Sequence, residues 1–276
     1  MTPQLAVVGD PVAHSVSPAL HRAALRSHEL SDWRYLRVRI PRGNLAASWE
    51  ELQGRFVGLN VTAPHKLEAA ELVGALTARA RACGSVNTVT FNAGGSLGDS
   101  TDGAGFLAAL SDVAERAPRR ALVLGAGGAA RAVAVALREL AAEVTLAARD
   151  RRRAQRVADE LHLGQVAIGM DPEELAAASS GADLLVNATP VGAEGTDSPL
   201  PSGVHLERST LVFDLLYSPP VTPLQRQAAA AGCRVVGGLG MLVEQAALSF
   251  EAWTSLPAPR GQMRRAGARA LRRRGS

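Results

Sequence analysis

The chain has 276 residues, which is enough for two modest domains that each build their own core. Hydrophobic residues make up 47% of it and charged residues 20%, as is ordinary for a soluble globular protein. The net charge of +4 would suit a nucleic-acid partner, but its distribution argues against one. Neither a signal-peptide pattern nor an apolar stretch of membrane-spanning length occurs, so we expect a cytoplasmic protein without a membrane partner.

The positive charge is concentrated near the C-terminus. The last stretch contains no acidic residue and seven arginines, Arg260, Arg264, Arg265, Arg269, Arg272, Arg273 and Arg274. Seven positive charges exceed the net charge of +4, so the rest of the chain is slightly acidic. Basic terminal segments of this kind are usually solvated. We therefore predict a solvated, frayed tail and no nucleic-acid partner.

The first part of the chain alternates strand-like and helix-like segments. Apolar runs predict strands at residues 5–9, 35–40, 56–61 and 86–91 and near Leu97. Helical patterns fall between them, at residues 18–28 and 44–54 and in a segment that ends near Arg81. Aromatic residues are only 4% of the chain, so Ala, Val and Leu must build the core. Strands separated by helices predict an α/β fold with a largely parallel sheet.

A second series of strands and helices begins near Arg120. Its strands are expected at residues 121–124, 144–148, 183–188, 211–215 and 234–236, with a long Ala-rich helix after the first of them. A helix over residues 242–253 then returns the chain to the first domain. We predict one domain from residues 1–103 and 240–276, and a Rossmann-like domain from residues 104–239.

The turn after the strand at residues 121–124 matches the dinucleotide fingerprint. Gly125 allows the sharp turn, Gly127 lets the backbone approach a pyrophosphate, and Ala130 permits close packing of helix on sheet. The N-terminus of the following helix presents free N–H groups to phosphates. The predicted contacts are Gly125, Ala126, Gly127, Gly128, Ala129 and Ala130.

The end of the next strand distinguishes NAD from NADP. NAD enzymes commonly place an acid there for the ribose 2′-OH, whereas NADP enzymes use arginine for the 2′-phosphate. Arg149 stands at this position, with Arg153 one turn further on, and the pattern favours NADP. Asp150 is the competing reader of the ribose, and a solvated helix start is the alternative role for the arginines.

Several polar motifs remain. Residues 9–21 place Ser15 and Ser17 on a loop before a helix, with Ser17 the expected N-cap ahead of Pro18. The others are residues 60–66 (NVTAPHK), 84–88 (GSVNT), 98–103 (GDSTDG), 187–189 (NAT), 214–217 (DLLY) and 238–246 (GLGMLVEQA). Residues 60–66 follow a buried strand, and ligands bind at the carboxyl ends of parallel strands.

In this order, from Gly9 to Gln245, these motifs resemble those of the shikimate dehydrogenase family. The resemblance implies a split substrate-binding domain and a central NADP-binding domain. It also implies the NADPH-dependent reversible reduction of 3-dehydroshikimate to shikimate, a step of aromatic amino-acid biosynthesis.

The resemblance assigns roles to individual residues. Lys66 and Asp102 would form the catalytic pair. The residues around shikimate would be Ser15, Ser17, Thr62, Lys66, Asn87, Asp102, Tyr217 and Gln245. Thr189, Leu215, Gly238 and Met241 would line the cofactor beside the glycine turn and the two arginines.

Other functions stay open at this point. An NAD-dependent quinate/shikimate dehydrogenase is disfavoured by Arg149 and by Ser17, which is often threonine in quinate-active relatives. An aminoshikimate dehydrogenase is hard to separate by sequence. A non-catalytic NADP-binding regulatory protein would have no need for Lys66 and Asp102 together. No His, Asp or Cys cluster has metal-ligand spacing, so no metal is expected. Monomer and homodimer are both open.

Overall fold

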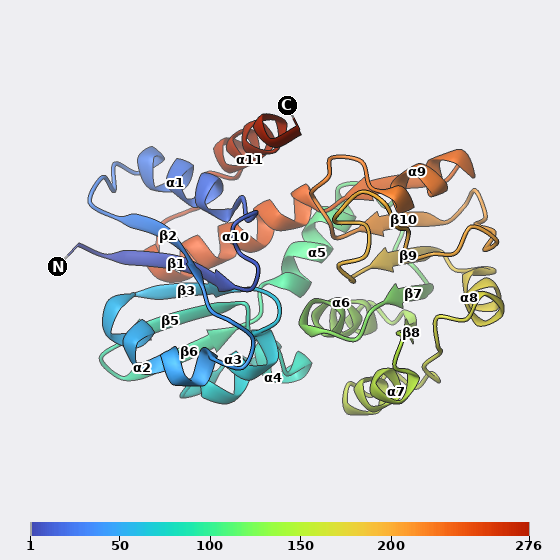
Figure 1. The fold of residues 1–276 in the computed structure, drawn as a ribbon, viewed down its shortest axis with the longest axis horizontal. Helices are drawn as coiled ribbons and strands as arrows, with labels where there is room; N and C mark the ends of the chain where they lie inside the picture. The colour runs from blue at the N-terminus through green and yellow to red at the C-terminus, as the bar shows by residue number, and fades with distance from the viewer. Residues whose placement is uncertain (1, 276) are drawn as a thin grey trace. The chain divides into compact units, whose positions relative to one another are not determined.

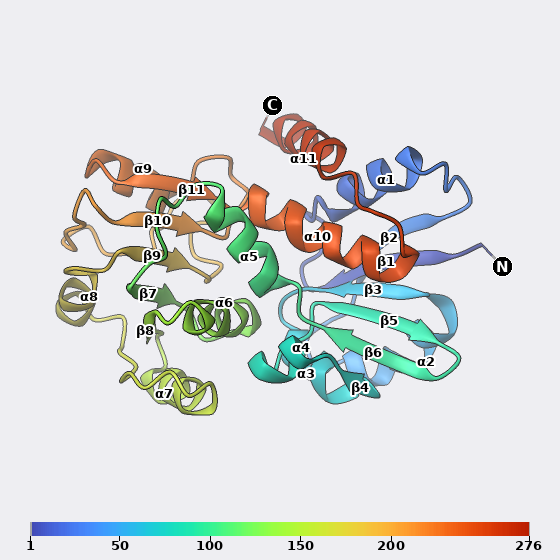
Figure 2. The same ribbon diagram turned by 180° about the vertical axis from the view of Figure 1, so that it is seen from behind.

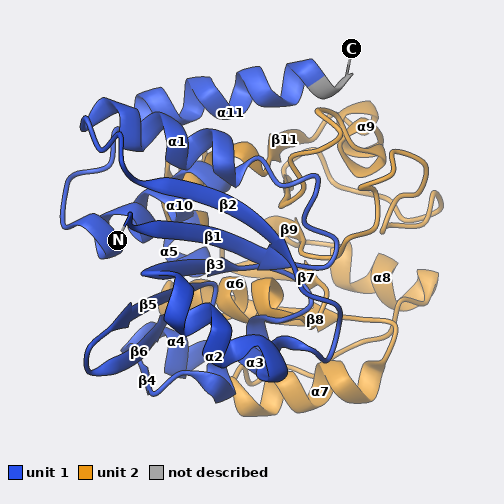
Figure 3. Cartoon of the chain, turned by 60° about the vertical axis from the view of Figure 1, so that its left-hand side comes forward, with its two compact units in different colours: residues 1–105, 242–274, 276 blue, residues 106–241, 275 orange. Residues whose placement is uncertain are grey.

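The computed structural model describes residues 2–275, with side chains up to residue 273, so the side chain of Arg274 lies outside the described part. The chain divides into two compact units (Figure 3). Unit 1 holds the residues up to 105 together with 242–274, and unit 2 holds residues 106–241. The boundaries expected from the sequence were 103/104 and 239/240. Helices α5 (Asp102–Ser111) and α10 (Leu239–Thr254) carry the chain across the two divisions.

Unit 1 contains a six-stranded sheet in the order β2-β1-β3-β5-β6-β4 (Figures 1 and 2). Its strands are β1 (Gln4–Gly9), β2 (Arg34–Arg39), β3 (Gly58–Val61), β4 (Ala75–Leu76), β5 (Thr88–Asn92) and β6 (Gly95–Asp99). β1 runs parallel to β2 and β3, and β4 runs parallel to β6. β5 is antiparallel to both of its neighbours, so its first residues lie beside the last residues of β3 and β6.

Helices cover both faces of this sheet. They are α1 (Ser17–Ser27), α2 (Leu45–Arg55), α3 (Lys66–Leu72), α4 (Ala78–Cys83), α10 and α11 (Arg260–Gly275). Because side chains alternate along a strand, Ala6 and Val8 face the core shared with α2, α3 and α4. On the other face the Tyr35 ring stacks on His21 of α1, with centroids 4.3 Å apart, and Trp253 of α10 lies 5.2 Å from His21.

Burial makes His21 sensitive to acid. Loss of water lowers its pKa to about 3, and the nearby Asn60 side chain opposes this only in part. An unfolded histidine has a pKa of about 6.5, so between those values only the unfolded chain binds the proton. His21 therefore does not change the free energy of unfolding above pH 6.5. Between pH 6.5 and 3 it lowers that free energy by up to about 1.4 kcal/mol for each pH unit.

We expect H21F to reduce the loss of stability between pH 6.5 and 4, because phenylalanine keeps the stacking and takes up no proton. Urea unfolding midpoints measured across this range would show it. H205Q, which removes an exposed histidine, is the matched control. The same pH slope in H21F and in the parent chain would contradict the assignment.

Unit 2 contains a parallel five-stranded sheet in the order β11-β10-β9-β7-β8. Its strands are β7 (Arg120–Leu124), β8 (Glu143–Ala147), β9 (Leu184–Asn187), β10 (Leu211–Asp214) and β11 (Arg234–Gly237). Its remaining helices are α6 (Gly128–Glu139), α7 (Arg151–Glu160), α8 (Pro172–Ser179) and α9 (Pro223–Ala230). Leu122 and Val212 pack with Leu175 of α8 and Leu224 of α9, whereas Phe213 on the opposite face contacts Phe106 of α5.

Two of the elements predicted from the sequence were wrong. The helix predicted to end near Arg81 is interrupted, because β4 pairs with β6 and Thr77 then caps a new helix by accepting from the Ala80 N–H. The Arg-rich tail is the helix α11 rather than a frayed end. Its Met263, Ala266 and Leu271 are buried at helical spacing. No helix within residues 2–275 has both the length and the hydrophobicity needed to cross a bilayer.

Candidate functional site

The topology of unit 1 brings three polar motifs to one edge of its sheet. Lys66 begins α3, one short turn after β3, and Asp102 begins α5, directly after β6. Asn87 precedes β5, whose antiparallel direction places its start at the same edge. The backbone fixes this arrangement, since the Val61 N–H donates to the Asn87 carbonyl (2.8 Å) and the Asn87 N–H to the Asp99 carbonyl (3.0 Å).

Lys66 and Asp102 form an ion pair whose side chains are 15% and 6% exposed. The second carboxylate oxygen of Asp102 accepts from the Asn87 amide at 2.9 Å. The same amide nitrogen lies 2.9 Å from Thr101 Oγ1 and 3.0 Å from Gln245 Oε1, so two N–H groups serve three acceptors. Residues 66, 87, 101, 102 and 245, from four separate segments, therefore share one hydrogen-bonded cluster.

A buried hydroxyl supports this cluster. Ser249 lies four residues after Gln245 on α10 and donates to its carbonyl at 3.0 Å. Its oxygen also lies 2.9 Å from Asn60 Nδ2 and 2.7 Å from Thr88 Oγ1. One donated and two accepted bonds use the full capacity of a hydroxyl. Ser249 was not among the residues expected from the sequence, although its i+4 spacing from Gln245 was the available signal.

Asp99 holds the segment that leads to Asp102. Its carboxylate accepts from Thr77 Oγ1 (2.6 Å), Arg79 Nε (2.6 Å) and the Ser100 N–H (2.8 Å). Burial alone would raise the pKa of Asp99, but the bonds from Arg79 and Thr77 outweigh it and hold the pKa below its usual value. The carboxylate thus remains charged and keeps the turn after β6 in place.

The serine loop, residues 10–17, follows β1 at the same edge of the sheet. Ser15 and Ser17 are almost buried, and Thr62 is half-buried on the turn after β3. The two loops are joined by a bond from the Asp10 N–H to the Ala63 carbonyl, 3.0 Å long. Ser17 was expected to cap α1, but it is the first residue of that helix, and Ser15 Oγ accepts its N–H instead (3.2 Å).

Lys66 has a further distinction in the sequence. It is the one lysine among 30 lysine and arginine residues, so arginine serves at every other basic position. An arginine cannot release its proton in a protein, whereas an amine can. The side chain beside Asp102 is therefore an amine that can exchange its proton.

The glycine turn of unit 2 has room for a phosphate group. Gly125 has φ +120°, and its N–H donates to the Ala147 carbonyl at 2.7 Å. A Cβ at Gly127 would meet nothing within 4 Å, so space is open beside its backbone. α6 begins at the next residue with neither a side-chain cap nor an acidic residue in its first turn. These features fit a bound pyrophosphate.

The positively charged residues after β8 suit a phosphate group in addition to the pyrophosphate. Arg149 and Arg153 are exposed. The Asp150 carboxylate is occupied as the N-cap of α7, where it accepts from the Arg153 N–H at 3.0 Å. Arg151 is paired with Glu174 at 2.7 Å. Two exposed arginines, Arg149 and Arg153, are thus available to a ligand at this corner of unit 2.

The other predicted cofactor residues follow β9, β10 and β11. Thr189 is held by Asn187, whose Oδ1 accepts from its hydroxyl at 2.7 Å. Asn187 in turn donates to Asp214 at 3.0 Å, and burial raises the pKa of that carboxyl group against its hydrogen bonds. Gly238 approaches the Leu215 carbonyl so closely that a Cβ would collide with it. Met241, at the end of unit 2, is buried.

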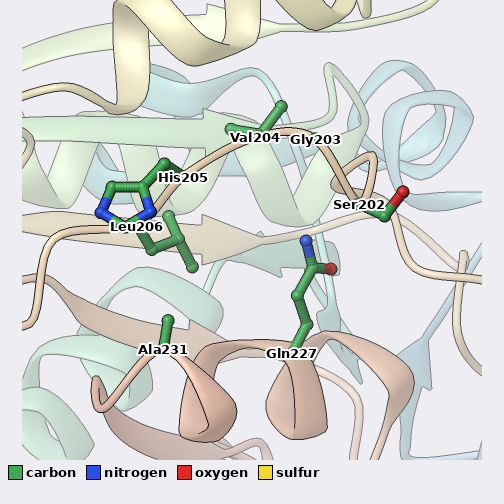
Figure 4. A pocket seen from close by; sticks show the side chains of 7 residues that line it. All are labelled: Ser202, Gly203, Val204, His205, Leu206, Gln227 and Ala231. Carbon is green, nitrogen blue, oxygen red and sulfur yellow. The ribbon is translucent and has the colours of Figure 1, made fainter.

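The predicted substrate residues are divided between the two units. Tyr217 follows β10 and belongs to unit 2, whereas the other seven belong to unit 1. A pocket of about 220 Å³ in unit 2 involves none of the predicted residues (Figure 4). Its Gln227 amide is already bonded to Ser198 Oγ (2.7 Å) and to the Pro201 carbonyl (3.1 Å).

Comparison with known proteins adds independent information. A family model described as the shikimate dehydrogenase substrate binding domain matches residues 7–89. A second model, described as the shikimate 5′-dehydrogenase C-terminal domain, matches residues 238–266. The first match spans the segments that carry Ser15, Thr62, Lys66 and Asn87, and the second spans Gln245.

Whole-chain relatives agree with these models. The chain is 42% identical to the shikimate dehydrogenase (NADP(+)) of Methanopyrus kandleri, covering 96% of this chain and 95% of the relative. It is similar in structure to a Thermus thermophilus shikimate 5-dehydrogenase solved with NADP(H) and shikimate (40% identity, TM-score 0.86, 98% and 100% covered). A Listeria monocytogenes shikimate 5-dehydrogenase solved with shikimate and NAD is 28% identical (TM-score 0.81, 96% of each chain). The chain belongs to the shikimate dehydrogenase family.

Proposed function

We propose that this protein is an NADP-dependent shikimate dehydrogenase that reversibly reduces 3-dehydroshikimate to shikimate in aromatic amino-acid biosynthesis. The observation that carries the proposal is the largely buried Lys66–Asp102 pair at one edge of the unit 1 sheet, where Asn87 donates to both Asp102 and Gln245. The names of the relatives from M. kandleri and T. thermophilus support the substrate and the cofactor. We further propose a cytoplasmic enzyme without a nucleic-acid or membrane partner.

Oxidation of a secondary alcohol removes a hydride from carbon and a proton from oxygen. NADP+ supplies the hydride acceptor when it is bound. In our proposal the Lys66 side chain lies against the reacting oxygen. As the ammonium group of the ion pair it gives a proton to that oxygen during reduction, and as the neutral amine it takes the proton back during oxidation. Asp102 orients that amine through the ion pair and is itself oriented by Asn87. The pair therefore holds the proton-exchanging group of Lys66 in one orientation.

The remaining polar groups suit a carboxylate with three hydroxyls. We assign the carboxylate to the hydroxyls of Ser15 and Ser17, and the ring hydroxyls to Thr62, Asn87, Asp102 and Gln245. Tyr217 is assigned to the substrate from unit 2. A site that pairs hydroxyl groups strongly rejects analogues that lack them, because its own buried groups would lose their partners.

In unit 2, we assign the pyrophosphate to the glycine turn and the start of α6, and the 2′-phosphate to Arg149 and Arg153. Thr189, Leu215, Gly238 and Met241 are assigned to the remainder of the cofactor. Unit 1 is then the substrate-binding domain and unit 2 the NADP-binding domain. Whether the enzyme is a monomer or a homodimer is a separate question, which light scattering on the purified protein answers.

Initial rates measured by nicotinamide absorbance test the proposal, with shikimate and quinate each paired with NADP and NAD. Fast turnover confined to shikimate with NADP is the expected result. Comparable rates with quinate or NAD would instead support a quinate/shikimate dehydrogenase. No turnover with any pair would contradict the proposed reaction and favour a regulatory NADP-binding protein.

The role of Arg149 gives a separate prediction. R149Q should raise the KM for NADP about tenfold or more and leave the KM for NAD nearly unchanged, because only NADP carries the 2′-phosphate that a charge-assisted bond would hold. R151Q is the matched control, since Arg151 is paired with Glu174. Equal changes for NADP and NAD in R149Q would show that this arginine does not distinguish the cofactors.

A further inference from the structure

One arginine outside the cluster at the sheet edge is bonded to the serine loop. Arg37 lies on β2, the edge strand beside β1. Its guanidinium donates from both Nε (3.1 Å) and Nη2 (2.7 Å) to the Ser15 carbonyl oxygen. The two residues are 22 positions apart, so this contact joins the loop to the sheet and is not a local turn bond.

Ser15 is also bonded within its own loop. Its N–H donates to the Val12 carbonyl at 3.1 Å, and its hydroxyl oxygen accepts from the Ser17 N–H at 3.2 Å. Those two bonds shape the loop from within, since Val12 belongs to the loop and Ser17 is the residue where it joins α1. The Arg37 bonds fix the Ser15 peptide relative to β2 and thereby set where both serine hydroxyls lie.

We propose that Arg37 is a positioning residue for carboxylate recognition. It holds the serine loop through the Ser15 carbonyl, so that the Ser15 and Ser17 hydroxyls meet a carboxylate together. This inference rests on the proposed function, which assigns those hydroxyls to the substrate carboxylate. Arg37 itself need not touch the substrate.

The choice of arginine follows from its geometry. A planar guanidinium with two adjacent donors on one oxygen fixes both the distance and the orientation of the peptide, whereas lysine presents a rotating point charge. Lysine should therefore replace Arg37 only in part. Because Arg37 is exposed, water will satisfy the carbonyl when the guanidinium is removed, so the fold should persist while the loop loses its fixed position.

The test compares R37M, R37K and R34M in steady-state kinetics with shikimate and NADP. R34M is the matched control, because Arg34 is also exposed on β2 and donates only to the carbonyls of nearby residues in its own segment, Ser31 and Trp33, among the bonds described. We expect R37M to raise the KM for shikimate about tenfold, with kcat within about twofold of the parent and the KM for NADP unchanged. R37K should fall between R37M and the parent, and R34M should match the parent.

Shikimate methyl ester provides the readout that a general structural defect would not produce. The parent enzyme should have a higher kcat/KM for the acid than for the ester. R37M should narrow this difference, because its kcat/KM should fall more for the acid than for the ester. The role of Arg37 would be overturned if R37M kept the KM of the parent enzyme or if its kcat/KM fell equally for acid and ester. It would also be overturned if R34M showed the same change as R37M. An inactive parent chain would overturn the proposed function, and the role of Arg37 with it.

Discussion

Replacing Lys66 by methionine should lower kcat by about a hundredfold to ten-thousandfold, the range that general acid–base catalysis contributes. Methionine fills a similar volume but has no proton to exchange, and it leaves Asp102 without its ion-pair partner. Shikimate binding should change little, since Ser15, Thr62 and Gln245 remain. Stopped-flow single turnovers and equilibrium binding would measure the chemical step and the affinity separately.

K66R is the control that separates charge from proton transfer. Arginine preserves the positive charge beside Asp102 but cannot give up its proton. If Lys66 moves the proton, K66R should be nearly as slow as K66M. High activity in K66R would show that a fixed positive charge suffices, and unchanged turnover in K66M would remove Lys66 from the mechanism altogether.

The second large effect is expected at Asp102. D102L should reduce kcat/KM by about a thousandfold, because Lys66 and the Asn87 amide would both lose the partner that orients them. It should also destabilise unit 1 by about 3 kcal/mol, the usual cost of removing one member of a buried ion pair. Rates at saturating and limiting shikimate, together with urea unfolding, measure the two losses.

D102N separates the effect of the negative charge at residue 102 from the effect of the side chain's shape. Asparagine keeps the size of the side chain and can still accept from Asn87, so we expect most of the stability to return while most of the activity stays lost. Activity close to that of the parent in D102N would mean that the charge of Asp102 is unnecessary. Both variants should bind NADP like the parent, since the assigned cofactor residues belong to unit 2.

Buried strands and the glycine turn were predictable because their signals are local. The run before Gly125 is apolar and short, and a turn with φ +120° there favours glycine. The α/β class follows from the alternation of such runs with helical patterns. The family resemblance, by contrast, depends on motifs that are far apart in sequence, and no periodicity in the chain connects Lys66 with Gln245.

What the sequence could not show depends on long-range contacts. α11 was taken for a frayed tail because its many arginines mask three apolar residues that become meaningful only when packed. Arg260 is bonded to Glu244 (2.9 Å) and Glu251 (2.7 Å), two acids on the preceding helix. Ser17 was expected at the N-cap because the Ser-Pro pair suggests it, but the neighbouring Ser15 supplies the bond. Local patterns cannot show which of two adjacent serines will accept.

The division of unit 1 between the two ends of the chain determines an order of events during synthesis. Residues 106–238 leave the ribosome before α10 and α11 exist, so the sheet of unit 2 is complete while unit 1 still lacks two helices. Until residues 245–253 emerge, Asn87 has no Gln245, Asn60 has no Ser249, and the indole of Trp253 cannot donate to the Val89 carbonyl. On the proposed assignments, the nascent chain therefore has most of its cofactor residues before it has a finished site for substrate. A chain that stalls before α10 would lack Gln245 and Met241, and on the proposed assignments it would have no catalytic activity.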